Sequence, residues 1–188
     1  MLMPLTISNQ RGVTLIEVLV TVIILSIGLL GVAGLQSRLQ QSEMEAYQRS
    51  QALLLLNDMA QRIISNRNAA ASYVTATTGV GVSLTNCPTT TATQQQRDTG
   101  EWCEALKGAG ETASGSKVGA MIGGRGCVES LGGGEYMITV AWQGLAPVSI
   151  PPASVACGKD SYDGPVGSTC SGDLCRRVVT TIVRVATL

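Results

Sequence analysis

The sequence contains no histidine and no phenylalanine, and aromatic residues make up only 3% of its 188 positions. Histidine is the commonest general base and transition-metal ligand, so its absence argues against an enzyme, and we expect no metal or cofactor. Net charge is also absent, because 13 basic residues balance 13 acidic ones. Without a surplus of positive charge no field attracts nucleic acid, and we expect no nucleic-acid partner.

Proline is missing between Pro4 and Pro88, which leaves room for a long helix. Charge is missing from Val18 to Leu35, and the stretch from Val13 to Leu35 is long enough to cross a hydrocarbon core of ~30 Å as a helix. Arg11 directly precedes this stretch, and a basic flank favours the cytoplasmic side of a membrane.

Beyond Leu35 the apolar positions become periodic instead of continuous. They recur at helical spacing at Leu35, Leu39, Ala46, Leu53, Leu56, Ala60 and Ile63. This pattern predicts that the helix continues to about Asn66–Asn68 and packs this stripe against the domain that follows. Gly28, Gly31 and Gly34 interrupt the apolar part, either for close helix packing or to let the segment unwind.

The later part of the chain predicts a small antiparallel sheet. Apolar residues alternate with others from Tyr136 to Trp142 and again from Arg177 to Val185. Gly132–Gly134 and Pro151–Pro152 mark turns. A sheet packed against the amphipathic half of the helix gives an α+β fold.

Six cysteines lie beyond the apolar segment, and their even number favours three disulfides in an oxidising compartment. Free thiols or a metal site are the alternatives, but no CxxC pair occurs. Fifteen complete pairings are possible. The candidates are Cys87, Cys103, Cys127, Cys157, Cys170 and Cys175.

The acidic residues of the polar stretches offer no acid and base pair. We expect solvated carboxylates at Asp98, Glu101, Asp160, Asp163 and Asp173. The segment Gly110–Lys117 superficially resembles a phosphate loop, but Ser116 intervenes and no strand pattern precedes it. We expect a flexible loop there.

The most informative segment is Arg11-Gly12-Val13-Thr14-Leu15-Ile16-Glu17 at the start of the apolar run. A carboxylate at the centre of a membrane helix costs about 2.5–3.5 kcal/mol, so Glu17 requires either a positive partner or hydration at the interface. The segment resembles the prepilin signature of the type IV pilin-like family, with Val13 where phenylalanine is usual. The resemblance implies cleavage by prepilin peptidase after Gly12, N-methylation of Val13, and pairing of Glu17 with the N-terminal amine of a neighbouring subunit.

The helix that follows is similar to that of minor pilins of the PilV type, the type IV pilus modification proteins. The similarity is carried by Glu17–Val20, Leu25–Gly31, Ala33–Gln36, Asp58-Met59, Arg62 and Asn66-Arg67. It implies a type IV pilin fold with a leader at 1–12, a transmembrane part at 13–35, an amphipathic part at 36–68 and a globular domain with disulfide-pinned loops at 69–188.

The resemblance also implies a structural function. The protein would start pilus assembly with other minor pilins, the major pilin and the inner-membrane assembly platform, and would support pilus biogenesis, twitching motility and adhesion. It would cross the inner membrane once, with its domain in the periplasm, and then enter the extracellular pilus. Two alternatives stay open: a pseudopilin of type II secretion, and a soluble periplasmic protein released by cleavage near Gly31–Ala33.

Overall fold

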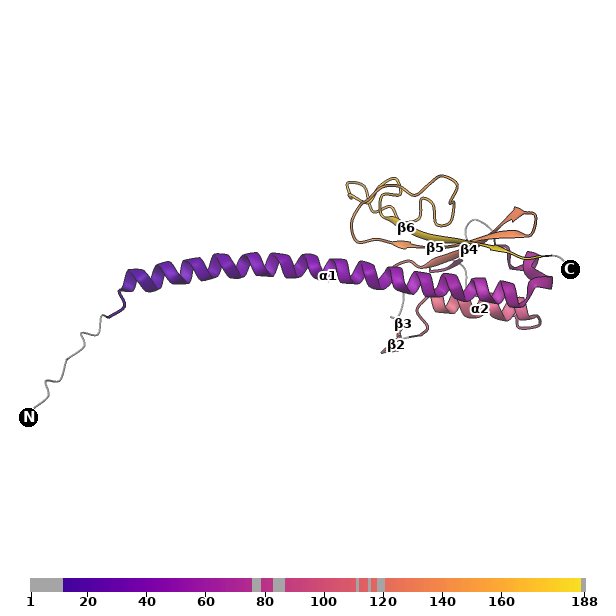
Figure 1. Cartoon of the computed structure of the whole chain (residues 1–188), viewed down its shortest axis with the longest axis horizontal. Coiled ribbons are helices and arrows are strands. Elements are labelled where there is room, and N and C mark those ends of the chain that lie inside the picture. Colours follow the sequence, from indigo (N-terminus) through magenta and orange to yellow (C-terminus); the bar gives the residue numbers. More distant parts are fainter. Residues whose placement is uncertain are drawn as a thin grey trace, which may run out of the picture. The chain divides into compact units, whose positions relative to one another are not determined.

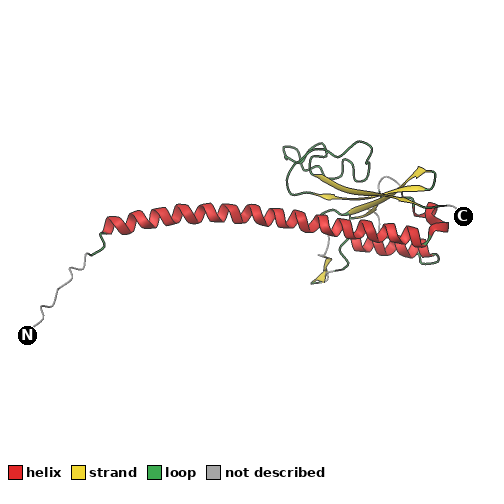
Figure 2. Ribbon diagram, in the orientation of Figure 1, coloured by secondary structure: helices red, strands yellow, loops and turns green. Residues whose placement is uncertain are grey.

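The computed structural model describes residues 12–75, 79–82, 87–110, 112–114, 116–117 and 121–186. The chain divides between Ser42 and Glu43 into two compact units. The helices are α1 (Leu15–Ser65), the 3-10 helix η1 (Arg67–Tyr73) and α2 (Gln94–Leu106). The strands, drawn in Figures 1 and 2, are β1 (Val80–Gly81), β2 (Thr112–Ala113), β3 (Ser116–Lys117), β4 (Arg125–Gly132), β5 (Glu135–Gln143) and β6 (Arg176–Arg184).

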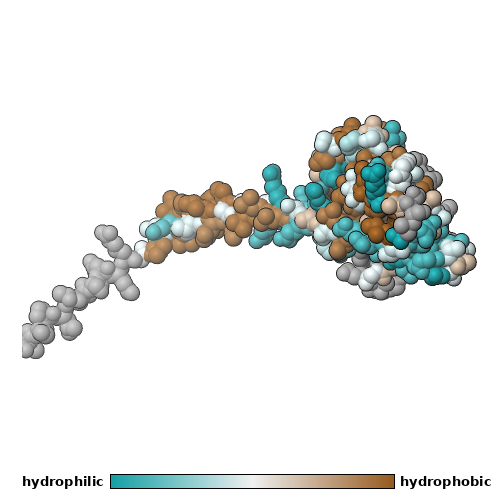
Figure 3. Space-filling model, turned by 45° about the vertical axis from the view of Figure 1, so that its right-hand side comes forward, coloured by the Kyte–Doolittle hydropathy of each residue, from teal (hydrophilic) through white to brown (hydrophobic). Residues whose placement is uncertain are grey.

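The first unit contains the apolar part of α1, and its described side chains are all exposed. Among the described helices, only α1 is long and apolar enough to cross a membrane, with an 18-residue window of mean hydropathy 2.7. Two hydroxyls within the apolar run are hydrogen-bonded to the helix backbone, since Thr21 and Ser26 donate to the carbonyls of Val18 and Val22 at 2.8 and 2.7 Å. The segment therefore presents the largely apolar surface that Figure 3 shows.

The second unit is built on an antiparallel sheet in the order β1-β4-β5-β6. β4 and β5 form a hairpin whose turn is made by Gly132, Gly133 and Gly134, all at positive φ. β5 and β6 pair without a shift from Glu135↔Arg184 to Gln143↔Arg176. The two strands expected from alternation are confirmed, together with the α+β pilin fold.

The main core lies between this sheet and the two helices. The last turns of α1 bury Leu56, Met59 and Ile63 in one cluster with Ile138 and Val140 of β5. Trp102 of α2 joins this cluster, and its indole N–H donates to the carbonyl of Leu55 at 2.9 Å. The ring lies directly over Gly126 of β4, where an added Cβ would come within 2.2 Å of it. Only glycine fits beneath Trp102.

The predicted stripe on α1 is partly wrong. The exposed members are Leu35, Leu39, Ala46 and Leu53. The buried residues of α1 are instead Gln48, Ala52, Leu56, Met59, Ala60 and Ile63. Leu35 and Leu39 belong to the first unit, where no described residue covers them. Leu39, Ala46 and Leu53 are seven residues apart, and on a straight helix this spacing rotates by about 20° per repeat. The side chains therefore turn away from the buried side of α1.

The segment between β5 and β6 covers part of the other face of the sheet. There the Cys127–Cys157 disulfide packs with Ala141 and Tyr162 in a second buried cluster. The Tyr162 hydroxyl donates to the carbonyl of Gly123 at 2.8 Å, and burial raises its pKa well above the usual value. The other disulfides join Cys87 to Cys103 and Cys170 to Cys175, so all six cysteines are paired. The expected disulfide-pinned loops are present.

Removing the Cys127–Cys157 bridge by a double serine replacement is expected to lower the free energy of unfolding by about 3–4 kcal/mol, from the chain entropy of the loop it closes. The matched control replaces Cys170 and Cys175, which are 5 residues apart rather than 30, and should lose about 2 kcal/mol. Denaturant titration of the detergent-solubilised chain measures both values. Equal losses would contradict the loop-length argument.

Candidate functional site

The sequence motif lies at the start of α1. Gly12, Val13 and Thr14 precede the helix, and the Thr14 carbonyl accepts the N–H groups of Glu17 and Val18 at 3.0 and 3.3 Å. Glu17 thus lies in the first turn, where the helix dipole favours a negative charge. Within the part of the chain that the structure describes, no ion pair or hydrogen bond reaches its carboxylate.

The surroundings of Glu17 are apolar. A shallow hollow on the same stretch of helix is lined by Val13, Leu15, Val18, Leu19, Val22 and Ile23. Val13 is 70% exposed, and so is Ile16 beside Glu17. Such a surface suits hydrocarbon or other apolar helices, and in either setting a lone carboxylate is costly without a positive partner. This arrangement can pair a charge between subunits, but it offers no reaction chemistry.

The comparisons with known families match this motif and the helix after it. The prokaryotic N-terminal methylation motif matches residues 7–33, and the family "Type IV pilin Tt1218" matches residues 34–109. The two matches adjoin, and together they cover more than half of the 188 residues. The chain belongs to the type IV pilin-like family. No curated protein and no solved structure matches it.

Membership of the type IV pilin-like family links the motif to processing and assembly. Pilins of this family are structural subunits that are processed by prepilin peptidase and assemble with other pilins. The methylation motif and the apolar helix indicate that this pilin is anchored in the membrane and incorporated in a pilus. The roles of Gly12, Val13 and Glu17 remain predictions.

A charge cluster joins the last turns of α1 to α2 of the pilin domain. The Arg62 guanidinium lies 3.0 Å from Asp58, 3.0 Å from Asp98 and 2.7 Å from Glu101. Tyr73 donates a short hydrogen bond to Asp98, whose side chain is 5% exposed. The prediction of a solvated carboxylate at Asp98 is therefore wrong, because α2 carries it into the domain, opposite Arg62.

The ionisation of this cluster follows from its contacts. Burial alone would lower the pKa of Arg62, but hydrogen bonds to its carboxylate partners outweigh burial and raise it. Burial, assisted by the hydrogen bond to Asp98, raises the pKa of Tyr73 to about 12. Arg62 therefore stays charged and Tyr73 stays neutral at physiological pH. The cluster is a fixed structural joint between two helices.

A second buried pair lies between β6 and the segment before it. Arg176 is 2% exposed, and its guanidinium donates to the carbonyls of Val155 and Cys157 at 2.7 and 3.1 Å. Its Nε lies 3.1 Å from Asp173, at an angle that makes an ion pair rather than a directed hydrogen bond. Asp173 also accepts the backbone N–H of Asp160 at 2.8 Å. The prediction of a solvated Asp173 is wrong as well.

The acidic loop around Asp173 has a structural role. Asp163 accepts the backbone N–H of Asp173 at 2.8 Å, while Asp160 and Asp173 themselves adopt positive φ. Among the residues that the structure describes, no group of three His, Cys, Asp or Glu side chains is arranged to hold a metal ion. The phosphate-like segment lies partly outside the described residues, since 111 and 115 are not among them.

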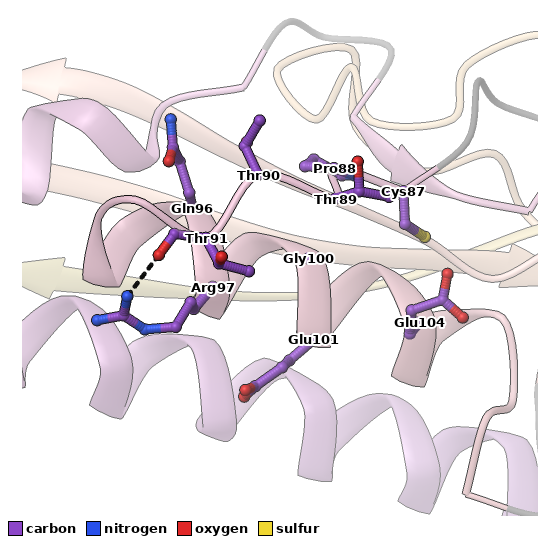
Figure 4. Close-up of a pocket in the computed structure, with 10 residues that line it drawn as sticks. All are labelled: Cys87, Pro88, Thr89, Thr90, Thr91, Gln96, Arg97, Gly100, Glu101 and Glu104. Carbon is purple, nitrogen blue, oxygen red and sulfur yellow. Dashed lines mark hydrogen bonds between the residues drawn. The ribbon is translucent and has the colours of Figure 1, made fainter.

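An open groove of about 470 Å³ lies between residues 87–91 and α2 (Figure 4). The Cys87–Cys103 disulfide holds the two sides together, and Arg97 donates to the Thr91 carbonyl at 2.6 Å. Gly100 allows the close approach, because an added Cβ would lie 2.6 Å from the Pro88 carbonyl oxygen. Glu101 on its rim is paired with Arg62.

Proposed function

We propose that this pilin is a minor pilin of the PilV type, which takes part in initiating pilus assembly and stays in the pilus. The observation that carries the proposal is the lone Glu17 carboxylate on an exposed apolar helix, directly after Gly12-Val13. Pairing this carboxylate with the amine of a neighbouring subunit would relieve the desolvation cost of both charges when helices bundle. Such pairing sets the axial register between subunits.

The proposal assigns a role to each part of the chain. Residues 1–12 are the leader, 13–35 cross the inner membrane once, 36–68 form the amphipathic part of the helix, and 69–188 form the periplasmic domain. Val13 carries the methylated amine after cleavage. The partners are prepilin peptidase, the inner-membrane assembly platform, other minor pilins and the major pilin, and the pilus that results supports twitching motility and adhesion.

Deleting the gene tests this function against that of a type II secretion pseudopilin, which shares the motif and the helix. We expect loss of surface pili and of twitching, restored by the wild-type chain, with exoprotein release unchanged. Electron microscopy, a stab-agar motility assay and quantification of secreted protein give the three readouts. Blocked exoprotein release with normal pili would overturn the pilus proposal.

The intact mass of the mature chain is expected to correspond to a start at Val13 plus one methyl group. An added Cβ at Gly12 meets no described atom within 4 Å, so the need for a small residue there comes from the peptidase. Gly12→Ala should therefore be processed better than Gly12→Leu, which should accumulate as precursor. Mass spectrometry of membrane fractions measures both. A mature chain starting at Gly34 would instead indicate a secretory signal.

A further inference from the structure

β6 forms one edge of the sheet, and among the described strands only β5 pairs with it. The N–H of Val185 donates to Gly134 and that of Gly144 donates to the carbonyl of Cys175, both at 2.8 Å. In an antiparallel ladder these two bonds fix which residues bond to the neighbouring strand. The backbone N–H and C=O groups of the odd-numbered residues of β6 therefore point toward β5. The outward backbone groups are those of Val178, Thr180, Ile182 and Arg184. No described residue forms a hydrogen bond with these outward backbone groups.

The middle of this edge lacks the devices that usually protect a free strand, although Arg176, Arg177 and Arg184 flank it. Val178–Val183 contains no charge, proline or glycine, and no bulge shifts its register with β5. Thr180 is exposed, and Ile182 is 59% exposed. The segment between β5 and β6 covers the outer face of the sheet near Val178, but leaves Thr180 and Ile182 open. An uncharged, accessible stretch of edge such as Val178–Val183 is a template for another strand.

The direction of β6 restricts what can pair with it. Arg177 at its start lies 3.3 Å from Glu45, whereas Arg184 and Val185 at its end line a small hollow with Ile64 and Arg67. Within the second unit, β6 therefore runs in the same direction as α1, as Figure 1 shows. An antiparallel partner strand must run opposite to α1.

A second copy of the chain does not supply such a strand. Antiparallel pairing of β6 with its own copy would point the last turns of the two α1 helices in opposite directions, whereas subunits paired through Glu17 as proposed above would run in the same direction. β5 runs opposite to α1, but it is hydrogen-bonded on both sides. β1 also runs opposite to α1, but it is two residues long. β2 and β3 are two residues each and pair with one another. Among the described strands, a second copy therefore offers no suitable partner, which favours a different chain.

We propose that the β6 edge binds an extended, uncharged segment of a non-identical pilin subunit by antiparallel β-strand addition. The added strand bonds to the outward backbone groups of residues 178–184, and β-branched or apolar side chains on it pack beside Thr180 and Ile182. This inference rests on the proposed function, because it takes the partner from the same assembly.

A photoreactive amino acid at position 182, in cells that assemble the whole pilus, identifies the neighbour of β6. We expect a cross-link to a different pilin subunit, with roughly tenfold higher yield than from position 166, a fully exposed loop site. A cross-link to a second copy of the chain would overturn the inference. So would equal yields at the two positions.

Proline substitution separates the free edge from the fold. Thr180→Pro removes an outward N–H and leaves the β5 ladder intact, so the chain should fold while the cross-link at 182 falls roughly tenfold. Thr181→Pro is the matched control, because it removes a bond to β5 and should destabilise the domain. Ile182→Lys, scored by co-purification with other pilins, should show the same loss of association as Thr180→Pro.

The two proposals fail in different ways. Unchanged cross-linking in Thr180→Pro, together with unchanged co-purification in Ile182→Lys, would overturn strand addition. If the deletion still abolishes pili, the minor-pilin function stands without it. Normal pili in the deletion strain would overturn the function itself.

Discussion

Glu17→Leu is expected to lower incorporation into pili at least tenfold while membrane insertion and cleavage proceed normally. Leucine removes the cost of burying a carboxylate, so insertion is unaffected or improved. It also removes the only charge on the first turns of α1 that could pair with a neighbour's amine. In a helix bundle of low dielectric such a pair is worth several kcal/mol, and loss of tenfold in association needs only about 1.4 kcal/mol. Immunoblots of sheared pili and of membranes measure the two pools.

Two further variants isolate the cause of the Glu17→Leu effect. Glu17→Gln keeps the size and polarity of the side chain but not its charge, and it should also accumulate as processed, poorly assembled protein. Glu43→Leu removes an exposed acid further along α1, beyond the apolar run, and should assemble normally. Normal piliation with Glu17→Leu in a deletion background would show that Glu17 is only a tolerated acid at the membrane interface.

Arg62→Ala is expected to lower the free energy of unfolding by about 3 kcal/mol, because it leaves the buried Asp98 carboxylate without its cation. The loss falls at the low end of the range for broken buried pairs, since Tyr73 and Gln94 still donate to Asp98. Denaturant titration of the detergent-solubilised chain measures it.

The control for Arg62→Ala is Arg67→Ala, which removes an exposed arginine one turn further on and should change stability by less than about 0.5 kcal/mol. Adding Asp98→Asn to Arg62→Ala should recover part of the loss, because a neutral amide needs no cation. If Arg62→Ala is as stable as Arg67→Ala, the joint between α1 and α2 contributes nothing.

Much of the fold could be predicted because local patterns determine it. The absence of proline and the composition of the helix located α1 to within a few residues of its end, and alternation located β5 and β6. α2 was missed because Gln94–Leu106 is mostly polar. A signal was present, since Thr93 and Gln96 form a reciprocal capping box with both bonds at 3.2 Å. β4 was missed because Val128 and Leu131 are its only large aliphatic residues.

The candidate site could also be predicted from the sequence only in part. The motif around Glu17 is contiguous, so the sequence alone was enough to locate it. The buried carboxylates were not predictable, because what buries them lies elsewhere in the chain. Asp98 bonds to Arg62, which lies 36 residues earlier in the chain, and to Tyr73, which lies 25 residues earlier. Composition could not show that these three side chains meet.

The parallel course of β6 and the last part of α1 has a mechanical consequence. Ladder bonds lie perpendicular to their strands, so a pull along α1 loads the β5–β6 ladder in shear and not in peeling. In shear the registered pairs from Glu135↔Arg184 to Gln143↔Arg176 share the force, whereas peeling would break them one at a time. Tension transmitted along a filament of such subunits would therefore meet the sheet in its strongest direction.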